Sequence, residues 1–131
     1  MARAIIYARS RNEDTAMMWA EFIHKECVKR EIEVVGIVVD RGKANAPARP
    51  KLVEVLDRLR SGEADVLACY DCGILYGDRS YNTPNGRYWI RQVKEAQIMF
   101  GFEMVFASAQ GDYIGDEFGR NPNRYERQPT R

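Results

Sequence analysis

The strongest constraint on the fold of this chain is the alternation of short apolar runs with longer segments of helical periodicity. Strands are expected at residues 2–8, 33–39, 65–70 and 103–107, and helices at about 12–30, 50–61 and 86–100. Strands that alternate with helices of this length form right-handed βαβ units. We therefore expect a three-layer α/β domain with a four-stranded, mostly parallel sheet flanked by helices.

The expected helices have apolar stripes and recognisable ends. Asn12 supplies a capping side chain and Glu13 and Asp14 supply first-turn acids, while Gly62 is placed to end the second helix. The stripes are Ala16, Trp19, Ala20, Ile23 and Cys27 in the first helix, Leu52, Val55, Leu56 and Leu59 in the second, and Trp89, Val93, Ala96 and Phe100 in the third. These side chains are the predicted helical part of the core.

Length and composition bound the class of protein. The chain has 131 residues, 45% of them hydrophobic and 30% charged, which is ordinary for a globular domain. We expect a folded domain over residues 1–115 and an irregular, arginine-rich tail over residues 116–131, because Pro122 and Pro129 oppose a long helix there. No apolar run has the length of a membrane span, and three cysteines do not make a disulfide framework. We therefore expect a cytoplasmic location.

The charge balance gives no global support for nucleic-acid binding, because the formal net charge is only +1. A local basic site remains open in the tail, which contains Arg120, Arg124, Arg127 and Arg131. A solvated terminus is the competing interpretation of that tail.

In a parallel sheet of this kind, ligands bind beyond the carboxyl ends of the strands. Those ends carry residues 8–10 (Ala-Arg-Ser), 40–42 (Asp-Arg-Gly), 70–72 (Tyr-Asp-Cys) and 108–110 (Ser-Ala-Gln). The sequence therefore places a candidate site at this edge of the sheet.

Residues 5–10, 38–42, 48–52 and 62–70 resemble, in order and spacing, the N-terminal catalytic domain of serine recombinases, the resolvase and invertase family. Tyr7 and Arg9 match its Tyr-x-Arg opening, Asp40 matches the acid after its second strand, and Arg49 matches the arginine that opens its next helix. The resemblance implies a resolvase-like fold. It also implies a chemistry in which a serine attacks phosphorus, arginines neutralise the phosphate, and neither metal nor cofactor takes part.

The chain departs from that family at the positions of the nucleophilic serine and the catalytic arginines. The family places its serine two residues after the arginine, where this chain has Arg11, whereas Ser10 directly follows Arg9. If strand geometry continues to residue 10, alternation points Ser10 away from Arg9, whereas a strand that ends earlier leaves the direction of Ser10 open. The family's arginine cluster aligns with residues 72–77, which contain no arginine, although Arg79 lies nearby. Residues 121–124 (Asn-Pro-Asn-Arg) interrupt the region of the family's long dimerisation helix.

These departures favour a degenerate, catalytically impaired serine recombinase domain, retained for DNA-related binding or for a partner such as a second copy or a related recombinase. The DNA contacts would come from Arg49, Arg79, Arg120 and Arg124. One alternative is an active site-specific DNA recombinase whose site residues are Ser10 as nucleophile, Arg9 and Arg49 on the phosphate, Asp40 orienting them, and Tyr7. Another is a protein-interaction or small-anion-binding module without a role on DNA. No metal or cofactor is expected in any of these.

Two weaker patterns are open to more than one interpretation. Cys69 and Cys72 form a Cys-x-x-Cys that a zinc site could share with His24 and Cys27, but buried thiols and a surface histidine explain the same residues. The aromatic and basic residues Tyr76, Arg79, Tyr81, Arg87, Tyr88, Trp89 and Arg91 either stack on a single-stranded nucleic acid or pack locally around a long loop.

Overall fold

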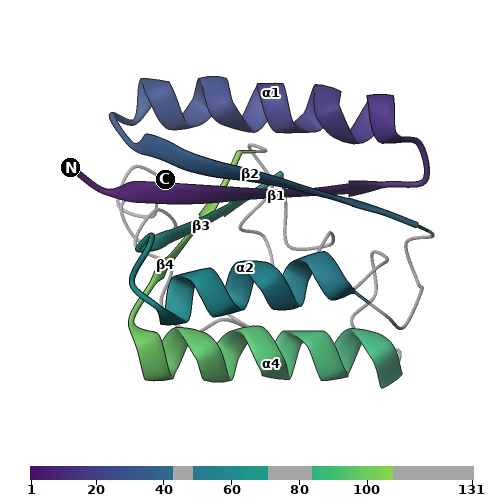
Figure 1. Ribbon diagram of the computed structural model, residues 1–131, viewed down its shortest axis with the longest axis vertical. Helices are drawn as coiled ribbons and strands as arrows, with labels where there is room; N and C mark the ends of the chain where they lie inside the picture. The colour runs from purple at the N-terminus through teal and green to yellow at the C-terminus, as the bar shows by residue number, and fades with distance from the viewer. Residues whose placement is uncertain (43–48, 71–83, 108–131) are drawn as a thin grey trace, which may run out of the picture.

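Four parallel strands form the centre of the structure, a computed structural model that describes residues 1–42, 49–70 and 84–107 (Figure 1). The elements in chain order are β1 (Arg3–Ser10), α1 (Glu13–Lys29), β2 (Glu33–Arg41), α2 (Pro50–Arg60), β3 (Val66–Cys69), α4 (Pro84–Phe100) and β4 (Glu103–Phe106). The strand order is β2-β1-β3-β4, and every neighbouring pair is parallel. The expected α/β class is confirmed.

Helices cover both faces of the sheet, with α1 on one face and α2 and α4 on the other (Figure 1). Alternation along β1 divides its side chains between the two resulting cores. Ile5 and Tyr7 lie in the core beneath α2 and α4, whereas Ala4, Ile6 and Ala8 lie in the core beneath α1. Because β1 is central and buried on both faces, odd-numbered and even-numbered residues of this strand point into different cores.

The two N-terminal helices begin for different physical reasons. The Asn12 side chain accepts hydrogen bonds from the backbone N–H groups of Asp14 at 2.8 Å and Thr15 at 3.3 Å, which caps α1 as expected. Helix α2 instead begins at Pro50, whose fixed φ suits the first helical position. The residue before it, Arg49, makes no side-chain cap and is therefore available to the interior.

Strands β1 and β2 run further than their apolar runs predict. The sequence suggests ends at residues 8 and 39, but pairing continues through Arg9 with Asp40 and Ser10 with Arg41. Arg9 and Asp40 stay inside because they form an ion pair at 3.0 Å. A hydrophobicity pattern ends where the apolar side chains end, so it does not detect this extension.

Most of the predicted helical core is buried, but two aromatic side chains are not. Trp19 and Phe100 are each 38% exposed. The Trp19 ring packs against Tyr70, with ring centroids 4.5 Å apart. It therefore lies at the edge of the interface between α1 and the sheet rather than in its centre. Phe100 is the last residue of α4 and lines a surface groove between α2 and α4. The buried stripe residues are Ala16, Ala20, Ile23, Cys27, Leu52, Val55, Leu59, Trp89, Val93 and Ala96.

Within the described residues, no helix has both the length and the apolar character needed to cross a bilayer. The expected boundary at residue 116 and the tail that follows it lie outside the described residues.

Candidate functional site

A buried ion pair joins the carboxyl ends of β1 and β2. Arg9 and Asp40 are register partners in the parallel ladder, and the Arg9 Nη1 atom lies 3.0 Å from Asp40 Oδ2. Arg9 is 5% exposed and Asp40 is 4% exposed. Two charges this deep persist because each compensates the other.

Asp40 is fully engaged on both of its oxygens. The Tyr7 hydroxyl donates to Asp40 Oδ2 at 2.8 Å, and the backbone N–H of Arg41 donates to Oδ1 at 3.1 Å. Burial is the main cause that raises the pKa of Tyr7 above its ordinary value, and the Asp40 carboxylate raises it further. The phenol therefore stays protonated and acts as a hydrogen-bond donor.

Arg49 brings a second guanidinium into the same interior. It stands immediately before α2 and is 2% exposed, the largest of the fully buried side chains. Burial lowers the pKa of Arg49, and the positive charge of Arg9 lowers it further, while its side-chain hydrogen bond to Tyr7 raises it. Because an arginine keeps its proton even so, the four side chains Tyr7, Arg9, Asp40 and Arg49 sum to one net positive charge.

Gly42 completes the wall around Arg9. Its φ is +153°, and an added Cβ would lie 2.7 Å from Arg9 Nη2. Its backbone N–H donates to the Ser10 carbonyl at 3.1 Å, which closes the ladder just beyond the ion pair. Gly42 is expected from the sequence at a strand end, with no role of its own. An arginine and an acid on adjacent strand ends, with glycine two residues after the acid, was the signal available.

Ser10 is not brought to these guanidinium groups. It remains in β1, paired with Arg41, so alternation directs its side chain to the opposite face from Tyr7 and Arg9. Its hydroxyl oxygen accepts a long hydrogen bond from the Asn12 N–H at 3.4 Å, at the start of α1. The structure thus unites Tyr7, Arg9, Asp40 and Arg49 and separates Ser10 from them. The remaining candidates, Arg79, Arg120 and Arg124, lie outside the described residues.

A polar hollow lies on the Ser10 side of the sheet edge. It has a volume of about 490 Å³ and is lined by Arg11, Asn12, Glu13, Asp14 and Arg41. Its lining contains two arginines and two carboxylates, so it has no net charge. Such a balanced hollow offers little attraction to a phosphate compared with an unopposed cluster of cations.

The cysteines of the described residues do not share a site. Cys27 lies in the core beneath α1 and Cys69 in the core on the other side of the sheet. Burial raises the pKa of the Cys27 thiol to about 11, so it is protonated at neutral pH. No cluster of three or more potential metal ligands occurs among residues 1–42, 49–70 and 84–107. Cys72 lies outside these ranges.

No protein-family model matches the sequence, and no curated protein matches it either. Solved structures do match. The C-terminal catalytic domain of ISC1926 TnpA, an IS607-like serine recombinase, aligns with a TM-score of 0.63 and 17% identity over 87% of this chain and 76% of its own. The N-terminal catalytic domain of TP901-1 integrase aligns with a TM-score of 0.66 and 14% identity over 98% of this chain and 99% of its own.

A resolvase family site-specific recombinase from Streptococcus pneumoniae aligns with a TM-score of 0.63 and 11% identity over 99% of this chain and 91% of its own. This chain has a resolvase-like fold. The resemblance seen in the sequence is thereby confirmed at the level of the fold. Identities of 11–17% carry no residue roles to this resolvase-like domain, so its chemistry is argued from its own side chains.

Proposed function

We propose that this resolvase-like domain has lost strand cleavage and is retained for DNA-related binding. One observation carries the first half of the proposal. Ser10 and Arg9 are consecutive residues of a paired strand, so the hydroxyl and the guanidinium point to opposite faces of the sheet. Phosphoryl transfer needs the nucleophile and the charge-stabilising groups around the same phosphorus atom.

The charge state of the buried cluster supports the same conclusion. Asp40 already compensates Arg9, and its two oxygens are occupied by Tyr7, Arg9 and the Arg41 backbone. At 5% and 2% exposure, Arg9 and Arg49 present almost no surface on which a phosphodiester could dock. Losing a single charge-stabilising donor costs about a hundred- to a thousand-fold in rate, so withdrawing both leaves little catalysis.

A binding role on DNA is supported by the fold and by the placement of the exposed cations. The structural neighbours include a resolvase family site-specific recombinase and an integrase catalytic domain. Outside the charge-balanced hollow at the sheet edge, the exposed cations include Lys51, Arg60 and Arg91, which are accessible to phosphate oxygens. Phosphate contacts of this kind are electrostatic and independent of sequence, so they survive the loss of a nucleophile.

The test of lost cleavage is a search for a covalent protein–DNA adduct on supercoiled plasmid. Wild type, Ser10→Ala and the control Ser61→Ala are incubated over a range of protein concentrations and analysed by denaturing electrophoresis. Ser61 is an exposed serine at the end of α2, remote from the cluster. We expect no adduct with any of the three proteins. An adduct that Ser10→Ala abolishes and Ser61→Ala preserves would show an active enzyme and end this half of the proposal.

The test of retained DNA binding is fluorescence anisotropy with a labelled duplex at increasing salt. Binding that weakens steeply with salt supports a role on the phosphate backbone. Absence of binding at low salt would overturn it, and sedimentation of the protein alone and with candidate recombinases would then test the partner role.

The convergence of Tyr7, Arg9, Asp40 and Arg49 favours a second candidate, an active recombinase whose strand end rearranges on DNA. A rearranged site would place Ser10 or another hydroxyl beside the guanidinium groups. The adduct assay separates this candidate from the first, because only an active enzyme links covalently to DNA.

A further inference from the structure

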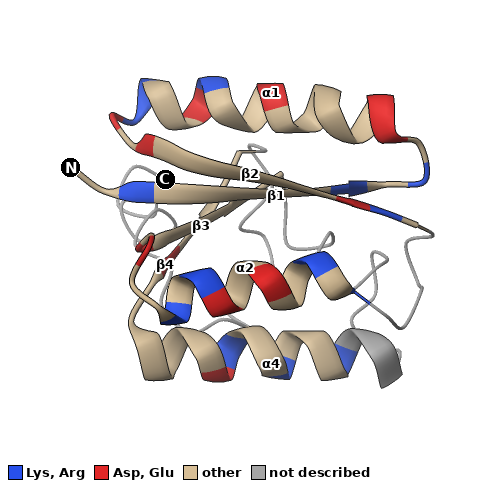
Figure 2. Ribbon diagram, viewed as in Figure 1, with Lys and Arg blue, Asp and Glu red and all other residues tan. Residues whose placement is uncertain are grey.

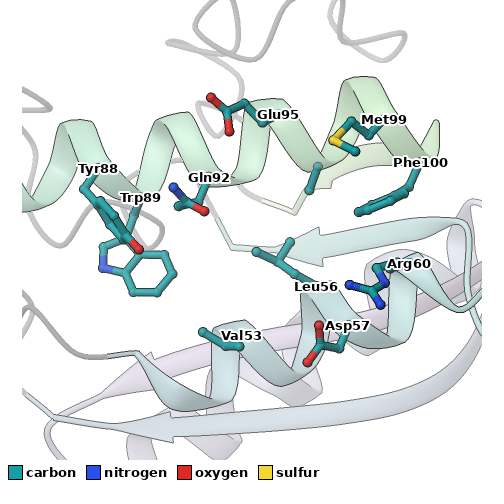
Figure 3. A pocket seen from close by; sticks show the side chains of 11 residues that line it. Val53, Leu56, Asp57, Arg60, Tyr88, Trp89, Gln92, Glu95, Met99 and Phe100 are labelled. Carbon is teal, nitrogen blue, oxygen red and sulfur yellow. The ribbon is translucent and has the colours of Figure 1, made fainter.

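Helix α4 has three distinct sides, and one of them is a row of cations. Trp89, Ile90, Val93 and Ala96 face the core. Tyr88, Gln92, Glu95 and Met99 line a groove of about 260 Å³ against α2 (Figure 3). Arg87, Arg91 and Lys94 follow one another at i, i+4 and i+7 and therefore share the remaining, outer side. The blue segments of α4 in Figure 2 mark this row, which we call the α4 basic row.

We propose that the α4 basic row is a binding surface for the phosphate backbone of DNA. This inference rests on the proposed DNA-binding role and assigns it a contact surface remote from the Tyr7–Asp40 cluster. Arg87 and Arg91 are exposed and Lys94 is partly exposed, so the row is accessible to a ligand.

The positions of the three cations destabilise helix α4. Arg87 lies in the first turn of α4, where the helix dipole repels a cation, and that turn contains no acid. The spacings Arg87 to Arg91 and Arg91 to Lys94 also bring like charges together on the helix surface. Helix α1 has the opposite and favourable arrangement, with Glu13 and Asp14 in its first turn and Lys29 in its last. An anion bound beside Arg91 and Lys94 would relieve the repulsion between these two side chains.

No carboxylate within the described ranges forms an ion pair with Arg91 or Lys94. The single acid of α4, Glu95, is exposed and lies four residues after Arg91, and its carboxylate points away from α2 in Figure 3. Elsewhere, basic side chains of helices do have such partners, since Glu26 pairs with both Lys29 and Arg30. The charges of Arg91 and Lys94 are therefore not compensated by an ion pair within the described ranges.

The dimensions and chemistry fit a nucleic-acid strand better than an acidic peptide. With a rise of about 1.5 Å per residue, Arg87 to Lys94 spans about 10 Å. Three successive phosphates of one strand span about 7 Å along a duplex, within reach of long, flexible side chains. Guanidinium groups match phosphate oxygens in a bidentate manner. No apolar side chain separates the three cations, so the row lacks the central anchor of a peptide interface.

The test measures the salt dependence of DNA binding for the full chain. One variant combines Arg87→Gln, Arg91→Gln and Lys94→Gln. The control combines Lys25→Gln, Lys29→Gln and Lys51→Gln, which removes the same charge from exposed sites on α1 and α2. A third variant combines Arg120→Gln and Arg124→Gln in the tail. Each protein is titrated against a labelled duplex and against a labelled single strand of the same length at several salt concentrations.

We expect the α4 variant to lower the slope of log K against log salt by about 2.7 on duplex, since each lost phosphate contact contributes about 0.9. On a single strand the corresponding decrease is about 2.1. The control should change the slope by less than a third of this. The α4 variant should also unfold at the same temperature as wild type or higher, because it removes like-charge repulsion.

An unchanged slope in the α4 variant, with wild type still binding DNA, would overturn the assignment of the row and leave DNA binding intact. In that event, a lower slope in the Arg120/Arg124 variant would move the contact to the tail. Equal losses in the α4 variant and the charge-matched control would also overturn the assignment, by showing a general charge effect. If wild type binds neither duplex nor single strand, the DNA-binding role itself fails and the inference fails with it.

Discussion

The Tyr7 hydroxyl donates a hydrogen bond to Asp40 Oδ2 at 2.8 Å, across the interface between the two longest strands. Both residues are at most 4% exposed, so water does not compete for this bond. The same oxygen pairs with Arg9, and the other oxygen of Asp40 accepts from the Arg41 backbone. The acid is thus an internal counter-ion that locks the ends of β1 and β2 together, which is a structural task.

Replacing Tyr7 with Phe should destabilise the fold by about 1–3 kcal/mol, because Asp40 loses a buried donor while the ring is kept. Chemical denaturation monitored by circular dichroism measures this loss. Tyr88→Phe is the control, since Tyr88 is 54% exposed and its removal should change stability by about 0.5 kcal/mol or less. Equal, small effects of the two substitutions would contradict a buried Tyr7–Asp40 bond.

The same substitution should also change how stability depends on alkaline pH. The pKa of Tyr7 is raised in the folded protein above its ordinary value of 10.0, chiefly by burial, so the unfolded chain releases this proton first. Stability linked to Tyr7 is therefore complete below pH 10 and falls as pH rises above it. We expect the free energy of unfolding of wild type to decline more steeply above pH 10 than that of Tyr7→Phe. Parallel curves would show that Tyr7 titrates normally.

The Arg9–Asp40 pair should show strong coupling in a double-mutant cycle. Arg9→Met or Asp40→Asn alone should each cost about 3–5 kcal/mol, because each leaves one buried charge without its counter-ion. The double variant should cost clearly less than the sum of the two. The exposed pair Lys29–Glu26, 3.8 Å apart with Lys29 74% exposed, is the control and should couple by less than about 1 kcal/mol. Additive costs at Arg9 and Asp40 would mean that they act independently.

Parts of the fold are predictable from the sequence where the stabilising interactions produce a periodic pattern within one helix or strand. The stripe Leu52, Val55 and Leu59 is buried as its spacing predicts, because a helix exposes that periodicity in the sequence itself. The ends of β1 and β2 were missed because Arg9 and Asp40 are charged, and only their pairing across strands keeps them in the ladder. Periodicity describes one element at a time, whereas the ion pair is a property of two.

The candidate site divides in the same way. Residues Tyr7, Arg9, Asp40 and Arg49 could be grouped in advance, because the carboxyl ends of parallel strands meet at one edge and the family resemblance selects the same residues. The burial of these four side chains could not be predicted, since the 2% exposure of Arg49 depends on how α2 packs against the sheet. The direction of Ser10 required knowing that β1 continues to that residue, which the apolar run alone does not indicate.

Gly42→Ala should destabilise the fold, because Gly42 packs directly against the Arg9 guanidinium. An added Cβ would lie 2.7 Å from Arg9 Nη2 at a backbone φ of +153°, so both strain and collision oppose it. We expect a loss of about 2–4 kcal/mol, compared with about 1–2 kcal/mol for the control Gly62→Ala. Gly62 has a φ of +81° but open space around it, so only the backbone strain remains. A smaller loss at Gly42 than at Gly62 would show that Arg9 moves aside freely.

The Cys27 thiol should be inert in the folded protein and reactive only after unfolding. Burial beneath α1 raises its pKa to about 11, so at pH 8 almost none of it is the nucleophilic thiolate. We expect iodoacetamide labelling of Cys27, mapped by mass spectrometry, to be at least a hundred-fold slower in native buffer than in denaturant.

Because the folded protein holds the Cys27 proton more tightly, the linked stability is complete below pH 9 and is lost as pH rises toward about 11. The matched control is Cys27→Ala, whose free energy of unfolding should be flatter across that interval. Fast native labelling at pH 8 would mean that α1 opens readily from the sheet, since the side chain is fully buried beneath it.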